Sequence, residues 1–151
     1  MAALVAAASP AGAEDAVKGG PGAPPVAEHD LAVTVTGLRS GKGKVMACLA
    51  SAPAAFPDCK GPGVARHLVV AAAKGAVELD FGPVPAGTYA ISLFHDENGN
   101  GKLDTMMMIP REGYGFSRDA AVRFGPPRFA AAAFAVGNAP ARQTLKVRYI
   151  F

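Results

Sequence analysis

The sequence predicts an all-β protein, an antiparallel β-sandwich of about seven strands, and three observations support this class. Short segments alternate apolar and polar residues with period two, which is typical of half-buried strands. Turn-forming residues separate these segments, since the chain holds 18 glycines and 13 prolines. No long helical period is visible. With 151 residues, of which 50% are hydrophobic and 18% charged, the chain has the size and composition of one globular domain.

Six segments are expected to form strands, and a seventh is ambiguous. Segment 30–36 (DLAVTVT) alternates cleanly, whereas 44–50 (KVMACLA) is apolar on both faces and is therefore expected to be a central strand. The other candidates are 67–73, 76–81, 88–94 and 143–151. Segment 129–136 (FAAAAFAV) predicts a helical turn that runs into a strand, because alanine favours helix but the segment is short.

The inward positions of these strands predict the hydrophobic core. The expected core residues are Leu31, Val33, Val35, Val45, Leu49, Val77, Leu79, Phe81, Ile91, Leu93, Leu145 and Val147. Tyr89 follows a Pro-Ala-Gly turn at the start of a strand. Its ring is expected to pack inward while its hydroxyl bonds the backbone at the corner.

The N-terminal region indicates export. Residues 1–13 (MAALVAAASPAGA) end in the small-x-small triplet of a signal-peptide cleavage site, but no Lys or Arg precedes the short apolar run. We interpret 1–13 as a partial signal peptide, the alternative being an Ala-rich tail. Residues 14–29 are rich in Gly and Pro and predict a flexible linker, which leaves 30–151 as the sandwich domain.

The chain has two cysteines, Cys48 in an expected strand and Cys59 in the loop that follows. A zinc site would need more ligands at suitable spacing, and the nearest histidine, His67, falls in another expected element. A disulfide fits the pair best, and closing so short a loop would stabilise the fold by about 3 kcal/mol. Such a bond persists in an oxidising compartment such as the bacterial periplasm. The alternative is two buried free thiols.

Segment 95–104 (HDENGNGKLD) has the spacing of a calcium-binding loop. The side chains of Asp96, Asn98, Asn100 and Asp104 and the carbonyl of Lys102 occupy ligand positions of the EF-hand pattern, with Gly101 at the sharp turn. The last position, where a bidentate glutamate belongs, is Met107, so the site needs an acid from elsewhere, such as Glu112. Calcium affinity should therefore be weak, with Kd about 10⁻⁴ to 10⁻³ M.

The same loop has two other interpretations. The dipeptides Asn98-Gly99 and Asn100-Gly101 favour a metal-free polar turn in which side chains bond their own backbone. A transition-metal site of His95, Asp96 and Asp104 is the second alternative. Without a metal, His95 is expected to end its strand, either facing solvent or packed.

Tyr114 and Phe116 each lie between or beside glycines, an arrangement that can expose aromatic rings for binding. Together with Arg111 they form a candidate binding surface for carbohydrate or cell envelope. The alternative is that both rings pack the long loop onto the sandwich.

Several function classes are not indicated. The sequence has no GxSxG, HExxH or P-loop motif, so we expect no enzyme. The net charge of +3 is dispersed, without the dense basic tracts and stacking aromatics of nucleic-acid binders. No apolar run approaches the roughly 20 residues of a membrane span.

Three segments together resemble a known family. PAGTYAISLFHDENGNGKLD, followed by IPREGYGFS and FGPPRFAAAAF, is similar to a family of bacterial exported proteins, domain of unknown function 2141, over about residues 30–151. The resemblance implies a periplasmic or secreted single-domain protein with a transthyretin-like or carboxypeptidase-regulatory-like sandwich, also described as immunoglobulin-like. It implies no catalytic residues, and the cysteine pair resembles a feature of a subgroup.

These observations lead to one leading hypothesis and one alternative. We expect a non-enzymatic exported sandwich module that binds Ca²⁺ weakly through the Asp/Asn loop, with calcium as its one cofactor. The alternative is a carbohydrate- or envelope-binding module that uses Tyr114, Phe116 and nearby arginines. Its partner would be an envelope glycan or another exported protein, and neither nucleic acid nor a membrane span is expected.

Overall fold

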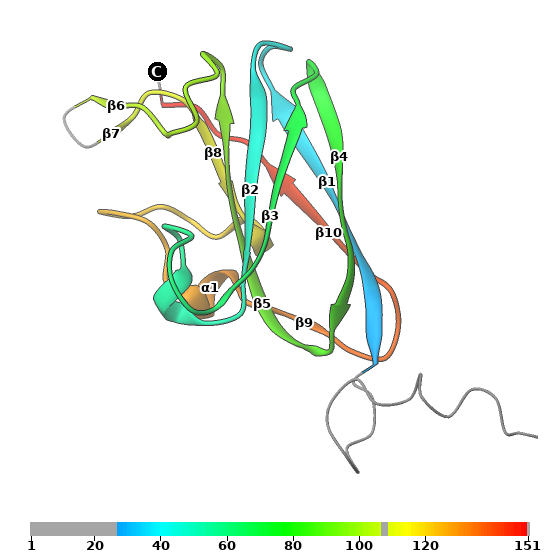
Figure 1. Cartoon of the computed structure of the whole chain (residues 1–151). Coiled ribbons are helices and arrows are strands. Elements are labelled where there is room, and N and C mark those ends of the chain that lie inside the picture. The colour runs from blue at the N-terminus through cyan, green and yellow to red at the C-terminus, as the bar shows by residue number, and fades with distance from the viewer. Residues whose placement is uncertain (1–26, 107–108, 151) are drawn as a thin grey trace, which may run out of the picture.

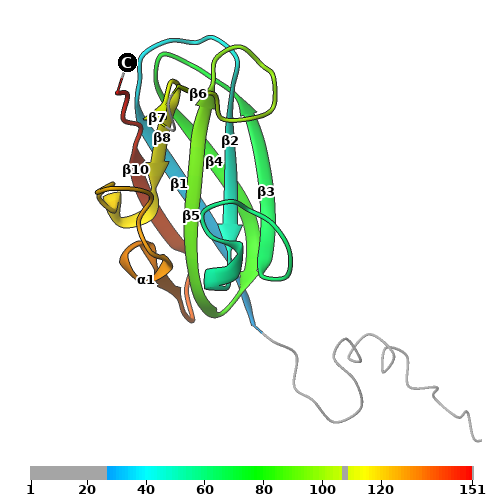
Figure 2. The same ribbon diagram turned by 90° about the vertical axis from the view of Figure 1, so that its left-hand side faces the viewer.

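A computed structural model describes residues 27–106 and 109–150 of the chain. Most of this part consists of strands arranged as two packed sheets, as Figures 1 and 2 show from two sides. The strands are β1 (Glu28–Leu38), β2 (Lys44–Ala50), β3 (Val64–Ala71), β4 (Gly75–Pro85), β5 (Gly87–Asp96), β6 (Thr105–Met106), β7 (Ile109–Pro110), β8 (Gly113–Phe116), β9 (Phe134–Val136) and β10 (Ala141–Lys146). The short helix α1 (Phe129–Ala132) and 3₁₀ turns at Pro53–Ala55 and Ser117–Asp119 complete the described elements.

The two sheets confirm the predicted all-β sandwich. One sheet has the order β10-β1-β4, and the other has the order β3-β2-β5-β8, with β9 also paired to β5. A separate two-stranded ribbon is formed by β6 and β7. All described pairs are antiparallel except β1 with β10, which is parallel. This parallel pair is a departure from the purely antiparallel sandwich expected, because alternation in a sequence does not encode strand direction.

The main hydrophobic core lies between the sheets and is built from the inward positions of their strands. All predicted core residues are buried except Val77, which is partly buried and packs against the core. Tyr89 is buried and its hydroxyl donates to the Pro85 carbonyl at 2.6 Å, so the predicted corner is confirmed. The predicted helical turn that runs into a strand at 129–136 is also confirmed, as α1 and β9.

Several predicted strand bounds need correction. The first strand begins at Glu28, so residues 28–29 belong to the domain and not to the expected linker. The strand expected at 67–73 spans Val64–Ala71, and its pairing with β2 extends through the register shift at Leu49/Ala50 to Val64. The last strand ends at Lys146, earlier than expected. The predicted signal peptide, linker residues 14–26 and the predicted strand end at Phe151 lie outside the described residues.

The outer face of the β3-β2-β5-β8 sheet is only partly covered. Near the lower end in Figure 1, the loop after β2 and helix α1 pack on it around a second apolar cluster. Its buried members are Ala50, Ala55, Phe56, Ala90, Phe116 and Ala132. The rest of this face lines a groove of about 970 Å³, which contains the cysteine pair and several apolar side chains.

Candidate functional site

The predicted calcium loop follows β5 and is folded by hydrogen bonds from its own side chains. The two carboxylate oxygens of Asp96 accept the backbone N–H groups of Asn100, at 3.2 Å, and Gly101, at 2.8 Å. Asp96 is fully buried, whereas Asn98 and Asn100 are exposed. The side-chain oxygen of each asparagine accepts the N–H two residues later, from Asn100 and Lys102 respectively, at 3.1 Å. The loop is therefore curled around the Asp96 carboxylate.

The side-chain amides of both asparagines converge on Asp104. Asn100 donates to one oxygen of its carboxylate at 2.7 Å, and Asn98 donates to the other. These two hydrogen bonds hold the pKa of Asp104 below its ordinary value. The structure thus brings Asp96, Asn98, Asn100 and Asp104 together in one loop, as the spacing predicts.

Glu112 supplies a further carboxylate from the turn between β7 and β8. It is buried, and its oxygens accept the backbone N–H groups of Glu97, at 2.7 Å, and Asp104, at 3.0 Å. The Arg111 N–H donates to the Asp104 carbonyl at 2.8 Å, which closes the contact between the two segments. Met107, which occupies the pattern's last ligand position, lies outside the described residues. The candidate replacement acid is therefore next to the loop.

A cavity of about 230 Å³ adjoins this cluster. Its lining residues are Arg39, Glu97, Asn98, Asp104, Arg111 and Glu112. Arg39 donates to Glu97 and forms an ion pair with it, which lowers the pKa of Glu97 and raises the pKa of Arg39. Positive and negative side chains are thus mixed around the cavity, and the guanidinium offsets part of the loop's negative charge.

His95 is buried below the loop and both of its ring nitrogens are bonded. Nδ1 lies 2.8 Å from the Tyr149 hydroxyl, and Nε2 lies 2.7 Å from the Lys42 carbonyl. The Arg39 guanidinium stacks over the Tyr149 ring at 4.3 Å from its centre. Burial raises the pKa of the Tyr149 hydroxyl. Because both ring nitrogens have partners, the structure does not assemble the alternative site of His95, Asp96 and Asp104.

The structure does not bring together the three residues of the predicted carbohydrate surface, Tyr114, Phe116 and Arg111. Tyr114 is half-buried and Phe116 is buried; both line the large groove. Phe116 packs edge-on against Phe56 in the second apolar cluster, with ring centres 5.7 Å apart. Arg111 instead lines the small cavity beside Glu112. The two rings therefore pack the long loop onto the sheet and still form part of the groove wall.

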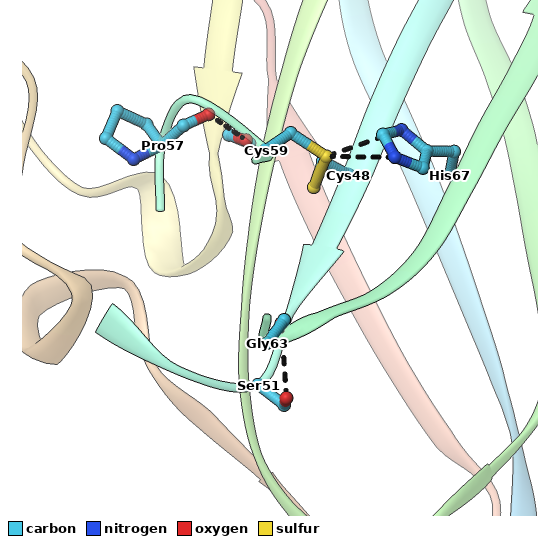
Figure 3. The surroundings of a disulfide bond; sticks show 7 residues. Cys48, Ser51, Pro57, Cys59, Gly63 and His67 are labelled. Carbon is cyan, nitrogen blue, oxygen red and sulfur yellow. Dashed lines mark hydrogen bonds between the residues drawn. A yellow bond between two sulfur atoms is a disulfide. The ribbon is translucent and has the colours of Figure 1, made fainter. Parts of the chain in front are cut away.

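The cysteine pair forms the predicted disulfide between Cys48 and Cys59, with Cα atoms 5.9 Å apart (Figure 3). His67 lies beside it, because β3 pairs with β2 in a register that sets His67 opposite Cys48. Its Nδ1 is 3.4 Å from the Sγ of Cys59. Sequence reasoning placed His67 in another element and missed this contact. The contact depends on strand register, which no local spacing around His67 indicates.

Residues 33–144 match the family model described as an uncharacterized protein conserved in bacteria (DUF2141). No curated protein and no solved structure matches the chain. Among the described helices, none has the length and apolar character needed to cross a membrane. The match spans most of the sandwich, from β1 to β10, and agrees with the resemblance noted in the sequence. The chain therefore belongs to the DUF2141 family of uncharacterized proteins conserved in bacteria.

Proposed function

We propose that this chain is a non-enzymatic, exported module that binds calcium weakly at the loop after β5. The observation that carries the proposal is the position of the Glu112 carboxylate, which contacts the loop at the amides of Glu97 and Asp104. A loop with EF-hand spacing lacks its terminal glutamate, and a carboxylate from the turn between β7 and β8 contacts the loop and is available to compensate. Calcium accepts six to eight oxygen ligands in flexible geometry, so ligands from two segments are compatible with a site.

The hydrogen bonds within the loop leave its oxygens able to bind a cation. A carboxylate or amide oxygen has two lone pairs, so accepting one N–H does not exhaust it. Calcium would displace the two asparagine amides from Asp104 and take their place between the loop's oxygens. The loop therefore exchanges internal hydrogen bonds for metal bonds without losing the backbone turn around Asp96.

The charge balance predicts weak affinity. Asp96, Asp104 and Glu112 are countered by Arg39 and Arg111, which line the same cavity as Asp104 and Glu112. These guanidinium groups reduce the local negative potential that draws in a divalent ion. We therefore expect Kd of about 10⁻⁴ to 10⁻³ M, which is the range of extracellular modules.

Isothermal titration calorimetry with CaCl₂ tests the proposal. The wild type should bind one Ca²⁺, and Asp104→Asn should bind at least about tenfold more weakly because it removes an anionic ligand. Glu78→Gln is the matched control, since Glu78 is an exposed acid on β4 whose partners are Thr34 and Arg142. Absence of binding heat, together with a melting temperature that is the same in CaCl₂ and in EDTA, would remove calcium from the proposal.

Export and the lack of catalysis are supported by different features. A disulfide between Cys48 and Cys59 is favoured in an oxidising compartment, in agreement with the sequence signals for export. His95 is the titratable ring nearest the acidic loop, but both of its nitrogens are held by Tyr149 and Lys42. It is therefore poorly placed to transfer a proton to a substrate. Periplasmic fractionation of the host is the direct test of export.

A second candidate function is binding of a cell-envelope glycan in the groove. The groove of about 970 Å³ favours it, because its wall includes the half-buried ring of Tyr114 and the exposed ring of Phe124. Aromatic faces and flanking polar groups are common in such sites. Retention on peptidoglycan that falls on Tyr114→Ala would favour this function, whereas equal recovery with and without peptidoglycan would exclude it.

A further inference from the structure

The disulfide has features of a reactive bond. We propose that the Cys48–Cys59 disulfide takes part in thiol–disulfide exchange at Cys59, and that His67 is the positioning residue that stabilises Cys59 as the thiolate. This activity is separate from the calcium site, whose loop begins at Asp96, the last residue of β5.

The geometry distinguishes the two sulfur atoms. Cys48 lies on the central strand β2 and is only 4% exposed, whereas Cys59 is half-buried in the loop that follows. His67 is exposed on the edge strand β3, and its Nδ1 is 3.4 Å from the Sγ of Cys59. Sulfur and nitrogen atoms of the three residues all lie within 4.8 Å of one another. Cys59 is thus the more accessible sulfur and the one next to an imidazole.

The backbone of Cys59 is also unusual. Its φ of 59° lies in the left-handed region, which residues with a Cβ rarely adopt. Such conformations persist when surrounding structure holds them, and they cluster at functional sites. Here the loop is held by the disulfide, by the backbone N–H of Cys59, which donates to the Ala55 carbonyl at 2.9 Å, and by the hydroxyl of Ser92, which donates to the Pro57 carbonyl at 2.9 Å. Breaking the disulfide would remove one of these constraints and release Cys59 to react.

The groove provides access for a second thiol. Cys48, Cys59 and His67 line it together with Pro57 and apolar side chains of the outer sheet face. The other charged groups on this part of its wall are Asp58 and Lys60, which are exposed and of opposite sign. Among the described residues of β2 and β5 that line the groove, none carries a charge. The His67 ring, with Nδ1 at 3.4 Å, is therefore the side chain in hydrogen-bonding contact with the reacting sulfur.

The exchange is balanced with two equivalents of an external thiol such as glutathione. The thiolate of the first attacks Cys59 Sγ, and the electron pair of the broken S–S bond goes to Cys48 Sγ, which takes a proton from water. A second external thiolate attacks the external sulfur of the mixed disulfide and expels the Cys59 thiolate, whose Sγ lies beside the His67 ring. The external thiols are oxidised to their disulfide, and the protein is reduced to two thiols.

Alkylation of the reduced protein by iodoacetamide, in EDTA and from pH 5 to 9, tests the role of His67. Peptide mass spectrometry should show that Cys59 reacts faster than Cys48, with a midpoint about one pH unit below the ordinary thiol value of about 8.5. His67→Gln should raise that midpoint and slow alkylation of Cys59 at pH 7 by about tenfold. His29→Gln on β1 is the matched control and should leave the rate unchanged.

Acid quenching of the oxidised protein during reduction by glutathione tests the site of attack without any substitution. The trapped mixed disulfide should carry glutathione on Cys59. Glutathione trapped on Cys48, or a Cys59 alkylation profile that is the same in the wild type and His67→Gln, would overturn the proposal and leave the disulfide with a structural role.

Discussion

Two loops extend from opposite ends of the β3-β2-β5-β8 sheet, and they are held by different forces. The acidic loop after β5 is held by hydrogen bonds to charged groups, above all to the buried carboxylate of Glu112. The loop between β2 and β3 is held by a covalent bond to Cys48 and by burial of Phe56 and Ala55. The first arrangement depends on pH and on ions, whereas the second depends on the redox state and on apolar packing.

Each loop also has one partner residue on which its proposed chemistry depends. In both cases a local motif is contacted by a residue that lies outside it. Glu112 reaches the acidic loop from the turn between β7 and β8, and His67 reaches the disulfide from the neighbouring strand β3. The chemistry we propose for each loop depends on this added residue. Substitutions at residues that contact each loop should therefore change the free energy of unfolding by different amounts in the two regions.

The largest expected loss of stability is at Gly43, which packs against the start of the acidic loop. Gly43 has φ of +67°, and a Cβ there would meet the carbonyl of Asp96. Gly61, in the disulfide loop, has φ of +75° but faces open space. Gly43→Ala should cost about 3 to 5 kcal/mol in the free energy of unfolding, because it adds a backbone clash to the left-handed strain. Gly61→Ala should cost about 1 kcal/mol, from strain alone.

Urea denaturation of both variants measures the difference directly. The pair is matched, since each change adds one methyl group at a glycine of similar φ, one beside each loop's support. Equal losses of stability would contradict the view that Gly43 is required by close approach to Asp96. Backbone strain alone would then account for the loss of stability in both variants.

The fold was more predictable from the sequence than the site was. Period-two alternation identified β1 and β4, because one face of each is packed against the other sheet. Strand β3 was misplaced by three residues at its start, since it is an edge strand whose exposed residues blur the alternation. The parallel pairing of β1 with β10 was not predicted, because it depends on the path of the whole chain.

The site was predictable where its residues are close in sequence. The spacing from Asp96 to Asp104 identified a loop whose side chains do converge, and the cysteine count identified the disulfide. The partners of His95 could not be found in this way, because Tyr149 reaches it from a segment more than fifty residues later in the chain. Contacts of that kind are set by strand register and packing, which local patterns do not specify.

An intermediate loss of stability is expected at Glu112, which accepts two backbone N–H groups of the acidic loop. Glu112→Ala should cost about 2 to 3 kcal/mol, because it leaves the amides of Glu97 and Asp104 without their acceptor. Glu112→Gln keeps one acceptor oxygen and should cost about half as much. In the other loop, Ser92→Ala removes one hydroxyl bond to Pro57 and should cost about 1 kcal/mol.

Thermal and urea unfolding of these three variants and the wild type measures the losses in the free energy of unfolding. The order of losses should be Glu112→Ala, then Glu112→Gln together with Ser92→Ala. If Ser92→Ala destabilises the protein more than Glu112→Ala does, hydrogen bonding would contribute more to the disulfide loop than to the acidic loop, and the proposed difference between the two loops would be wrong.

The smallest expected effect concerns the pH dependence of the acidic loop. Arg39 holds the pKa of Glu97 below its ordinary value, so the folded state favours the ionised carboxylate. Stability from this pair is present above the unfolded pKa of about 4.3 and is lost as the pH falls through the lower folded pKa. Because the pair is partly exposed, the contribution should be about 1 kcal/mol or less.

Comparing the wild type with Glu97→Gln from pH 7 to pH 2.5 isolates this contribution. The wild type should be more stable at pH 7, and the difference should shrink as the pH falls below about 4, because the amide side chain of the variant cannot titrate. Repeating the series at 0.5 M NaCl should reduce the difference at pH 7, since salt screens a pair at the surface. A constant difference across the pH range would show that ionisation of Glu97 adds no stability beyond the hydrogen bonds that its side chain accepts from Arg39 and Ser40.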